Sequence, residues 1–118
     1  MYENGQGVKQ DFAKARYWFE KSAEKGNALA QYNLGQMYRI GKGVKQDYAK
    51  AVDCYEKSAK QGTADAQYNL GVIYYYGQGG VKQDKEKACY WWEKAANQGV
   101  AKARIALEMM YSKGDGIK

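Results

Sequence analysis

Apolar residues in this chain recur three and four positions apart, within segments that glycine-containing turns separate. In residues 11–25 the recurring positions are Ala15, Trp18, Phe19, Ser22 and Ala23. In residues 28–40 they are Ala30, Leu34, Met37 and Tyr38, and in residues 64–76 they are Ala66, Leu70, Ile73 and Tyr74. Such spacing places them on one stripe of an α-helix. The pattern predicts six helices, over residues 11–25, 28–40, 47–61, 64–76, 84–98 and 101–113.

Residues that favour helix ends stand at the borders of these segments. Asp11, Asp47 and Asp84 precede three of them, and an aspartate carboxylate can accept a hydrogen bond from a free backbone N–H of the first turn. Asn27 and Thr63 are expected to cap two others. Glycines at 26, 62 and 99 are expected to end the helices before them, because glycine readily adopts the left-handed conformation.

The segments form a repeat. GQGVKQD at residues 5–11 returns as GKGVKQD at 41–47 and as GQGGVKQD at 77–84, and AQYNLG at 30–35 returns unchanged at 66–71. Equivalent positions lie 36 residues apart, and 37 apart beyond the extra glycine, Gly80. A period of this length is typical of stacked repeats that contact mainly their neighbours. The sequence therefore predicts an all-α solenoid.

The repeated positions A-x-x-x-L-G-x-x-Y-x-x-G-x-G-V-x-x-D-x-x-K-A resemble the Sel1-like repeat, a relative of the tetratricopeptide repeat. The resemblance covers nearly the whole chain, and the GVKQD wording is most similar to bacterial members. It implies a right-handed superhelix of antiparallel helix pairs that binds proteins as a scaffold or adaptor. We expect one domain over residues 1–118, with a partial repeat 1–27, repeats 28–63 and 64–100, and a partial repeat 101–118.

Within a repeat we call the first helix A (residues 28–40, 64–76 and 101–113) and the second helix B (11–25, 47–61 and 84–98). By resemblance to tetratricopeptide arrays, the A helices line a concave groove. The A-helix face opposite the core supplies the candidate peptide-binding residues: Tyr32, Asn33, Gln36, Tyr68, Asn69, Val72, Tyr75, Tyr76, Ile105 and Met109. Asn33 and Asn69 could bond a peptide backbone, since an amide both donates and accepts. The alternative is that the tyrosines only pack on one another.

A second candidate interface lies at the beginning of the chain. Tyr2 matches Tyr38, so nearly all of a first A helix is missing from the repeat pattern. The helix 11–25 is then expected to expose Phe12, Trp18 and Phe19, which favours end-to-end self-association. Because the chain resembles an excerpt of a longer array, no localisation is predicted.

Composition limits the chemistry. The chain has no histidine and two cysteines outside any repeated pattern, so we expect no metal site, no cofactor and no disulfide framework. Its net charge of +6 comes from lysines that alternate with acids, as on a solvated helix face, so nucleic-acid binding is disfavoured. No apolar run approaches the roughly 18 residues of a membrane span.

One catalytic motif deserves comparison with the repeat pattern. Ser22-Ala23-Glu24-Lys25 spells S-x-x-K, the nucleophile signature of penicillin-recognising enzymes, and cysteine-rich relatives in the resembled family have been linked to β-lactams. However, Ser22 takes the small core position of Ser58 and Ala95, and the S-D-N and K-T-G partners are absent. We therefore expect a non-catalytic module that binds a protein or peptide of unknown identity. The alternatives are a structural spacer of a larger protein and a β-lactam-hydrolysing enzyme.

Overall fold

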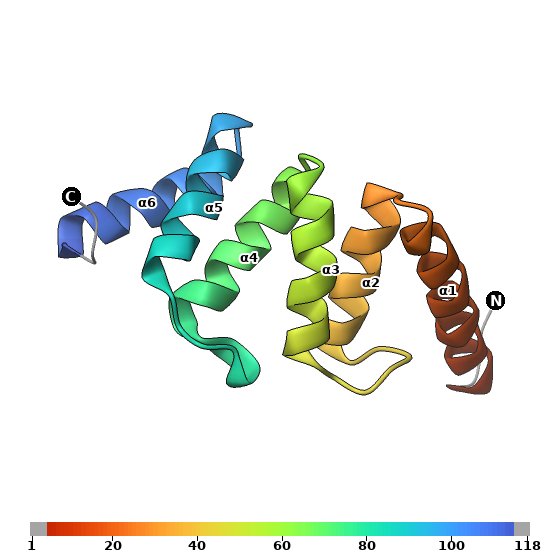
Figure 1. Ribbon diagram of the computed structural model, residues 1–118. Coiled ribbons are helices and arrows are strands. Elements are labelled where there is room, and N and C mark those ends of the chain that lie inside the picture. Colours follow the sequence, from red (N-terminus) through yellow and green to blue (C-terminus); the bar gives the residue numbers. More distant parts are fainter. Residues whose placement is uncertain (1–4, 115–118) are drawn as a thin grey trace.

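The chain folds into a row of helices that zigzags from one end of the molecule to the other (Figure 1). The structure, a computed structural model, describes the backbone of residues 5–114 and the side chains of residues 13–114. Its elements are α1 (Gly5–Glu24), α2 (Ala28–Ile40), α3 (Tyr48–Lys60), α4 (Ala64–Tyr76), a 3₁₀ turn η1 (Gln78–Gly80), α5 (Lys85–Asn97) and α6 (Ala101–Lys113). Over the described residues the prediction of an all-α fold with six helices is confirmed.

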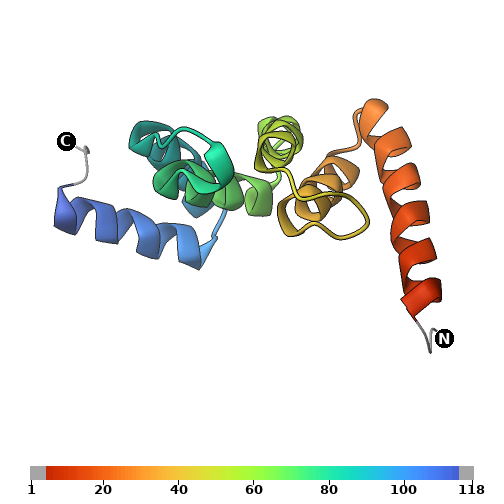
Figure 2. The same cartoon turned by 90° about the horizontal axis from the view of Figure 1, so that it is seen from below.

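The helices stack in one direction, which gives the molecule an elongated shape. Its principal extents are 50 × 25 × 24 Å. The A helices α2, α4 and α6 follow one side of the row, and the B helices α3 and α5 follow the other (Figure 2). Packing is closest within a repeat, between α2 and α3 and between α4 and α5. This order is that of a solenoid, in which each element contacts only elements near it in the chain.

Most predicted caps form. The carboxylate of Asp47 accepts from the Lys50 N–H at 3.1 Å, and that of Asp84 accepts from the Lys87 N–H at 3.0 Å. Asn27 accepts in the same way from the Ala30 N–H at 2.8 Å. Thr63 occupies the cap position of α4 with no side-chain cap bond. The three described A helices begin and end where the sequence pattern predicts.

The predicted start of the first helix is wrong. Helix α1 begins at Gly5, so Asp11 lies inside a helix rather than at its cap. In the later repeats the same loop is fastened to the preceding A helix. There the Asp47 N–H donates to the Tyr38 carbonyl at 2.8 Å, and Gln46 donates to the Arg39 carbonyl at 2.7 Å. The residues that match Tyr38 and Arg39 in the first repeat fall outside the described ones.

Aromatic rings from the B helices fill spaces that glycines leave on the A helices. A Cβ added to Gly35 would stand 2.8 Å from the Tyr55 ring, and one added to Gly71 would stand 2.2 Å from Trp92 Nε1. Both rings are buried in a core with Leu70, Ile73 and other apolar side chains. At the equivalent position α6 carries Glu108, which forms an exposed ion pair with Arg104 at 3.8 Å. The glycines therefore determine how closely the A helix approaches the B helix in each of the two central repeats.

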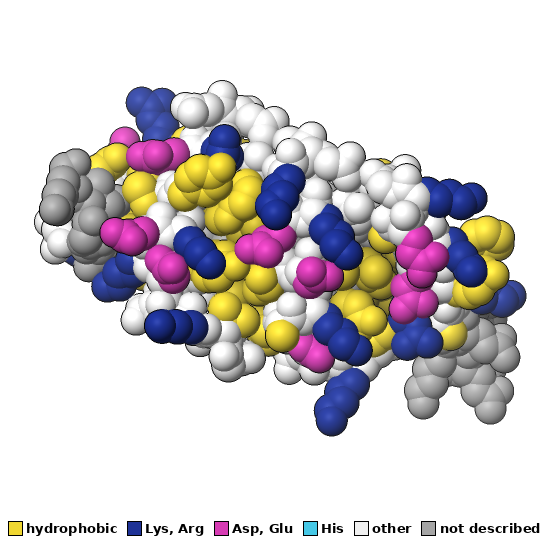
Figure 3. Space-filling view, in the orientation of Figure 1, with side chains coloured by type: hydrophobic (Ala, Val, Ile, Leu, Met, Phe, Trp, Pro, Cys, Tyr) yellow, Lys and Arg dark blue, Asp and Glu magenta, His cyan; other side chains and the backbone are white. Residues whose placement is uncertain are grey.

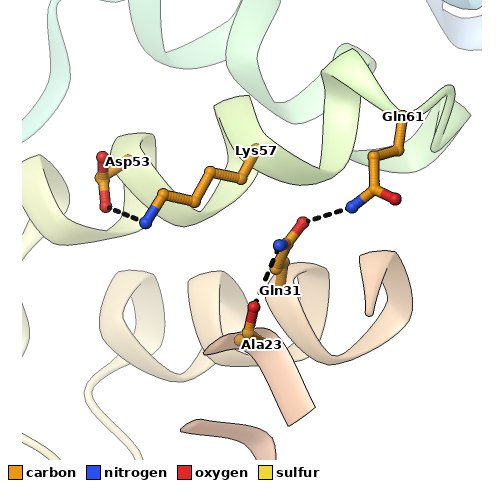
Figure 4. Close-up of polar contacts among 5 residues, drawn as sticks. All are labelled: Ala23, Gln31, Asp53, Lys57 and Gln61. Atoms are coloured by element: carbon orange, nitrogen blue, oxygen red, sulfur yellow. Dashed lines mark hydrogen bonds and ion pairs between the residues drawn. The ribbon is translucent and has the colours of Figure 1, made fainter. Parts of the chain in front are cut away.

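Paired glutamines join one repeat to the next (Figure 4). The buried amide of Gln31 donates to the Ala23 carbonyl of the preceding repeat at 3.2 Å, and Gln61 donates to Gln31 Oε1 at 2.9 Å. Gln67 and Gln98 repeat this arrangement, with bonds of 3.1 Å to the Ala59 carbonyl and 3.0 Å between the amides. The glutamine of the AQYNLG motif is thus a joint between repeats.

Candidate functional site

A trough opens on the A-helix side of the molecule, between α4 and α6. We call it the aromatic trough. Its volume is about 360 Å³. Its lining residues are Tyr68, Tyr75, Tyr76, Trp92, Lys102, Ile105, Ala106, Met109, Met110 and Lys113. A concave site of this size, with mainly apolar walls and a few polar groups, is typical of ligand pockets.

Helical spacing builds the α6 wall of the trough. Its members from Lys102 to Lys113 follow at intervals of three, one, three, one and three positions, so they form one continuous stripe. Ile105 and Met109 on this stripe are 56% and 50% exposed, and Tyr76 on the opposite wall is 63% exposed. Large apolar side chains that gather around one hollow in this way mark a candidate binding surface.

Trp92 of α5 forms the floor of the trough. It is only 4% exposed, and its indole N–H donates to the Tyr68 carbonyl at 3.1 Å. Its ring stacks on Tyr68 with 6.5 Å between centroids and lies 5.4 Å from the Tyr75 ring. Trp92 is not among the candidate peptide-binding residues of the sequence analysis, which all lie on A helices. The sequence does contain a signal for it, because Trp92 takes the position of Tyr55 in the repeat and each ring faces a repeated glycine. The larger ring of Trp92 reaches further across the A helix.

One repeat earlier along the row, hydrogen-bonded side chains from α2, α3 and α4 occupy the place that is equivalent to the trough. We call these residues, Gln36, Arg39, Tyr55 and Asn69, the polar cluster. Gln36 Oε1 accepts from the Tyr55 hydroxyl, from Arg39 Nε and Nη2 at 3.2 and 3.1 Å, and from Asn69 Nδ2 at 3.2 Å. Burial raises the pKa of Tyr55, so its hydroxyl stays a donor at neutral pH. The amide oxygen of Gln36 is therefore engaged within the protein.

The other five candidate residues are not in the lining of the aromatic trough. Tyr32 and Asn69 line a second hollow with Asp65, and this hollow shares Tyr68 and Lys102 with the aromatic trough. The pKa of Tyr32 is raised by burial and by the nearby Asp65 carboxylate. Asn33 and Gln36 line a third hollow beside α1. Val72 is half-buried and packs against the core. The structure thus brings five of the ten candidates together: Tyr68, Tyr75, Tyr76, Ile105 and Met109.

Aromatic side chains are also exposed at the beginning of the chain. Trp18 is 64% exposed and meets Tyr17 edge to face, with 5.4 Å between ring centroids. Phe19 is half-buried and lines the third hollow with Met37 of α2. Phe12 lies outside the described side chains. Of the two residues predicted for an end interface whose side chains are described, Trp18 is exposed and Phe19 is half-buried.

Charge is distributed differently on the two sides of the row. On the B-helix face, acidic and basic side chains are interspersed (Figure 3), as in the ion pair of Asp53 and Lys57 at 3.4 Å. The aromatic trough has Lys102 and Lys113 on its wall and no acidic residue among its described lining. The trough therefore combines apolar surface with positive charge.

The described residues offer little for catalysis. Burial raises the pKa of the Cys54 and Cys89 thiols to about 11, so both free cysteines are protonated at neutral pH. No group of three His, Cys, Asp or Glu side chains suited to a metal ion occurs in the part of the chain that the structure describes. Ser58, the counterpart of Ser22, is buried and donates to the Ala28 carbonyl at 2.7 Å. None of the described helices is long and apolar enough to cross a membrane.

Known proteins share this sequence pattern and this fold. The family model described as Sel1 repeat matches residues 1–27, 28–63, 64–100 and 100–118. A Sel1 repeat protein from Oxalobacter formigenes is 34% identical, with a TM-score of 0.85 over 90% of this chain and 43% of its own. A protective antigen of uropathogenic Escherichia coli is 38% identical, with a TM-score of 0.82 over 89% of this chain and 22% of its own.

A third similar structure is the cysteine-rich protein B of Helicobacter pylori. It is 30% identical, with a TM-score of 0.68 over 85% of this chain and 69% of its own. The chain therefore spans less than half the length of the first two relatives. No curated protein matched it. Sel1-repeat proteins generally mediate protein–protein interactions and are typically non-catalytic. With four matching repeats and these structural neighbours, the chain belongs to the Sel1 repeat family.

Proposed function

We propose that this chain is a peptide-recognition module whose binding site is the aromatic trough. The observation that carries the proposal is the exposure of Tyr76, Ile105 and Met109 around one hollow with a rigid tryptophan floor. A ligand that covers these side chains removes apolar surface from water, which stabilises the complex by roughly 25 cal/mol per Å² covered. Aromatic anchors in a well-packed hollow also tend to dominate the energy of an interface.

The floor of the trough is held in place before any ligand arrives. The indole N–H of Trp92 is satisfied by the Tyr68 carbonyl, and its ring is packed by Tyr68 and Tyr75. A site that is already ordered loses little conformational entropy on binding. This supports recognition by the trough rather than by the polar cluster, where the acceptor of Gln36 is already occupied.

The test is a peptide-display selection on the protein and on two variants. Tyr76→Ala/Met109→Ala removes exposed trough side chains that carry little of the core. Tyr90→Ala is the matched control, because Tyr90 is an exposed tyrosine on the other side of the row. We expect peptides that enrich on the protein and on the control, and that are lost on the double variant.

Other results would contradict the proposal. If no peptide enriches, or if enrichment survives the double variant, the trough is not the binding site. A structural spacer would give the first of these outcomes. Self-association through Trp18 is a separate proposal, and a Trp18→Ala variant compared by sedimentation at high micromolar concentration tests it. A monomer in both cases would rule it out.

A further inference from the structure

Two lysines stand at the two ends of the α6 wall of the aromatic trough. Lys102 and Lys113 are eleven residues apart on one helix, which separates them by about 16 Å along its axis. The exposed apolar side chains of Ile105 and Met109 lie between them. A ligand that fills the trough therefore meets an apolar centre with a positive charge at each end.

Neighbouring charges leave this positive character in place. The Lys85 ammonium lies over the Tyr75 ring, 5.3 Å from its centroid. The carboxylate of Asp65 lines the adjacent hollow together with Lys102. Asp65 therefore reduces the positive field at the Lys102 end of the trough.

From this arrangement, and resting on the proposed function, we infer the chemical class of the peptide. The aromatic trough receives a segment with one large apolar anchor side chain and with aspartate or glutamate on both sides of it. The anchor covers Trp92 and Met109, while the flanking carboxylates meet Lys102 and Lys113. Charges at the rim of an interface contribute mainly to selectivity and to the rate of association.

The spacing of the lysines also sets the spacing of the acids. An extended strand rises about 3.3 Å per residue, so about five positions separate two carboxylates that reach both lysines. A bound helix rises 1.5 Å per residue and places them about eleven positions apart. The spacing that a selection returns therefore reports the conformation of the bound peptide.

Single-stranded nucleic acid is the competing class, because it too combines stacking with negative charge. Its binders follow a backbone with a positively charged groove and present flat aromatic platforms. Here the ring of Trp92 lies 4% exposed beneath walls of isoleucine and methionine, and the α6 stripe carries two lysines. This geometry favours a side chain that enters the trough over a base that stacks on a surface.

The experiment is a selection from a random peptide library with amidated C-termini, so that every carboxylate belongs to a side chain. It is run on the protein, on Lys102→Met/Lys113→Met, and on Lys45→Met/Lys82→Met. The last variant removes two exposed loop lysines and matches the change in net charge. We expect an apolar anchor between two acids on the protein and on the control, and loss of the acids on Lys102→Met/Lys113→Met.

Affinity measurements with one selected peptide complete the test. We expect each lysine removed to weaken binding about two- to fivefold, and added salt to weaken it further. Asp65→Asn should strengthen binding, because it removes the opposing carboxylate. Anchored peptides without acids, or equal affinities of the lysine variant and its control, would overturn this inference and leave the proposed function intact. Displacement of the peptide by an oligodeoxythymidine would also overturn it.

Discussion

The polar cluster and the aromatic trough occupy equivalent places in successive repeats and differ in almost every side chain. Gln36 corresponds to Val72, Arg39 to Tyr75, Tyr55 to Trp92 and Asn69 to Ala106. In the polar cluster the groups bond to one another across the joint between α2, α3 and α4. In the aromatic trough the Trp92 indole donates to the Tyr68 carbonyl, and the apolar side chains of Tyr76, Ile105 and Met109 face the solvent.

One framework thus carries a hydrogen-bonded joint in one place and an open, mainly apolar trough in the next. Both repeats have a glycine that faces the B-helix ring, Gly35 or Gly71, and both have a glutamine pair. We call these two glycine positions the glycine seats. A satisfied polar network fixes its members in one arrangement, since an unpaired buried group costs about 1–3 kcal/mol. We therefore expect these four positions to contribute to whether the A-helix surface is held by hydrogen bonds or left apolar.

The largest effect should come from the ring beneath each surface. Trp92→Ala and Tyr55→Ala each empty a buried site and should cost about 3–5 kcal/mol of unfolding free energy. Urea unfolding followed by far-UV circular dichroism measures this. Only Trp92→Ala should also abolish peptide binding, under conditions where both variants are folded. Loss of binding in both would show that the polar cluster belongs to the site.

A smaller effect should separate the two glycine seats. Gly71→Ala places a Cβ 2.2 Å from Trp92 Nε1, whereas Gly35→Ala places one 2.8 Å from Tyr55. Overpacking costs about 1–3 kcal/mol, and alanine returns about 1 kcal/mol of helix propensity. We expect a net loss of about 2 kcal/mol for Gly71→Ala and a smaller net loss of about 1 kcal/mol for Gly35→Ala. Equal losses in urea unfolding would contradict this ranking.

Removing the hydroxyl of Tyr55 tests the hydrogen bonds of the polar cluster while the ring stays in place. Tyr55→Phe removes one donor to Gln36 and leaves those of Arg39 and Asn69. We expect a loss of about 0.5–1.5 kcal/mol of unfolding free energy, with peptide selection by the trough unchanged. A loss above 3 kcal/mol would mean that the network collapses as a unit.

The smallest expected change in stability comes from converting one surface into the other. The variant Gln36→Val/Arg39→Tyr/Tyr55→Trp/Asn69→Ala removes all partners of the polar cluster together. Replacing all partners by apolar groups is often nearly neutral, so we expect a change of about 1 kcal/mol or less. The variant should gain a second peptide-binding trough, seen as a binding stoichiometry of two in calorimetry. A stoichiometry of one would show that these four positions are insufficient.

Much of the fold could be predicted because helix borders and repeat register depend on local residues. Asp47, Asp84 and Asn27 cap as expected, and the A-helix bounds follow from periodicity. The start of α1 could not be predicted, because the loop in later repeats depends on bonds to a preceding helix.

The candidate site, too, could be predicted from the sequence only in part. Tyr76, Ile105 and Met109 were predictable from the A-helix stripe, which fixes the face but not the partners. Gln36 and Asn69 lie on that face too, yet their amides bond to each other across two repeats, which no single-helix pattern reveals. Trp92 comes from a B helix, and its reach into the trough depends on the space at Gly71.

The glycine seats also govern how the protein can be lengthened by engineering. A duplicated copy of residues 28–63 placed between Thr63 and Ala64 would contain both Gly35 and Tyr55. The inserted repeat would therefore supply both residues of this contact. An added B helix after α6 would instead meet Glu108, where the side chain occupies the space that a ring needs. The interior of this array is thus a natural insertion point, and α6 would first require Glu108→Gly.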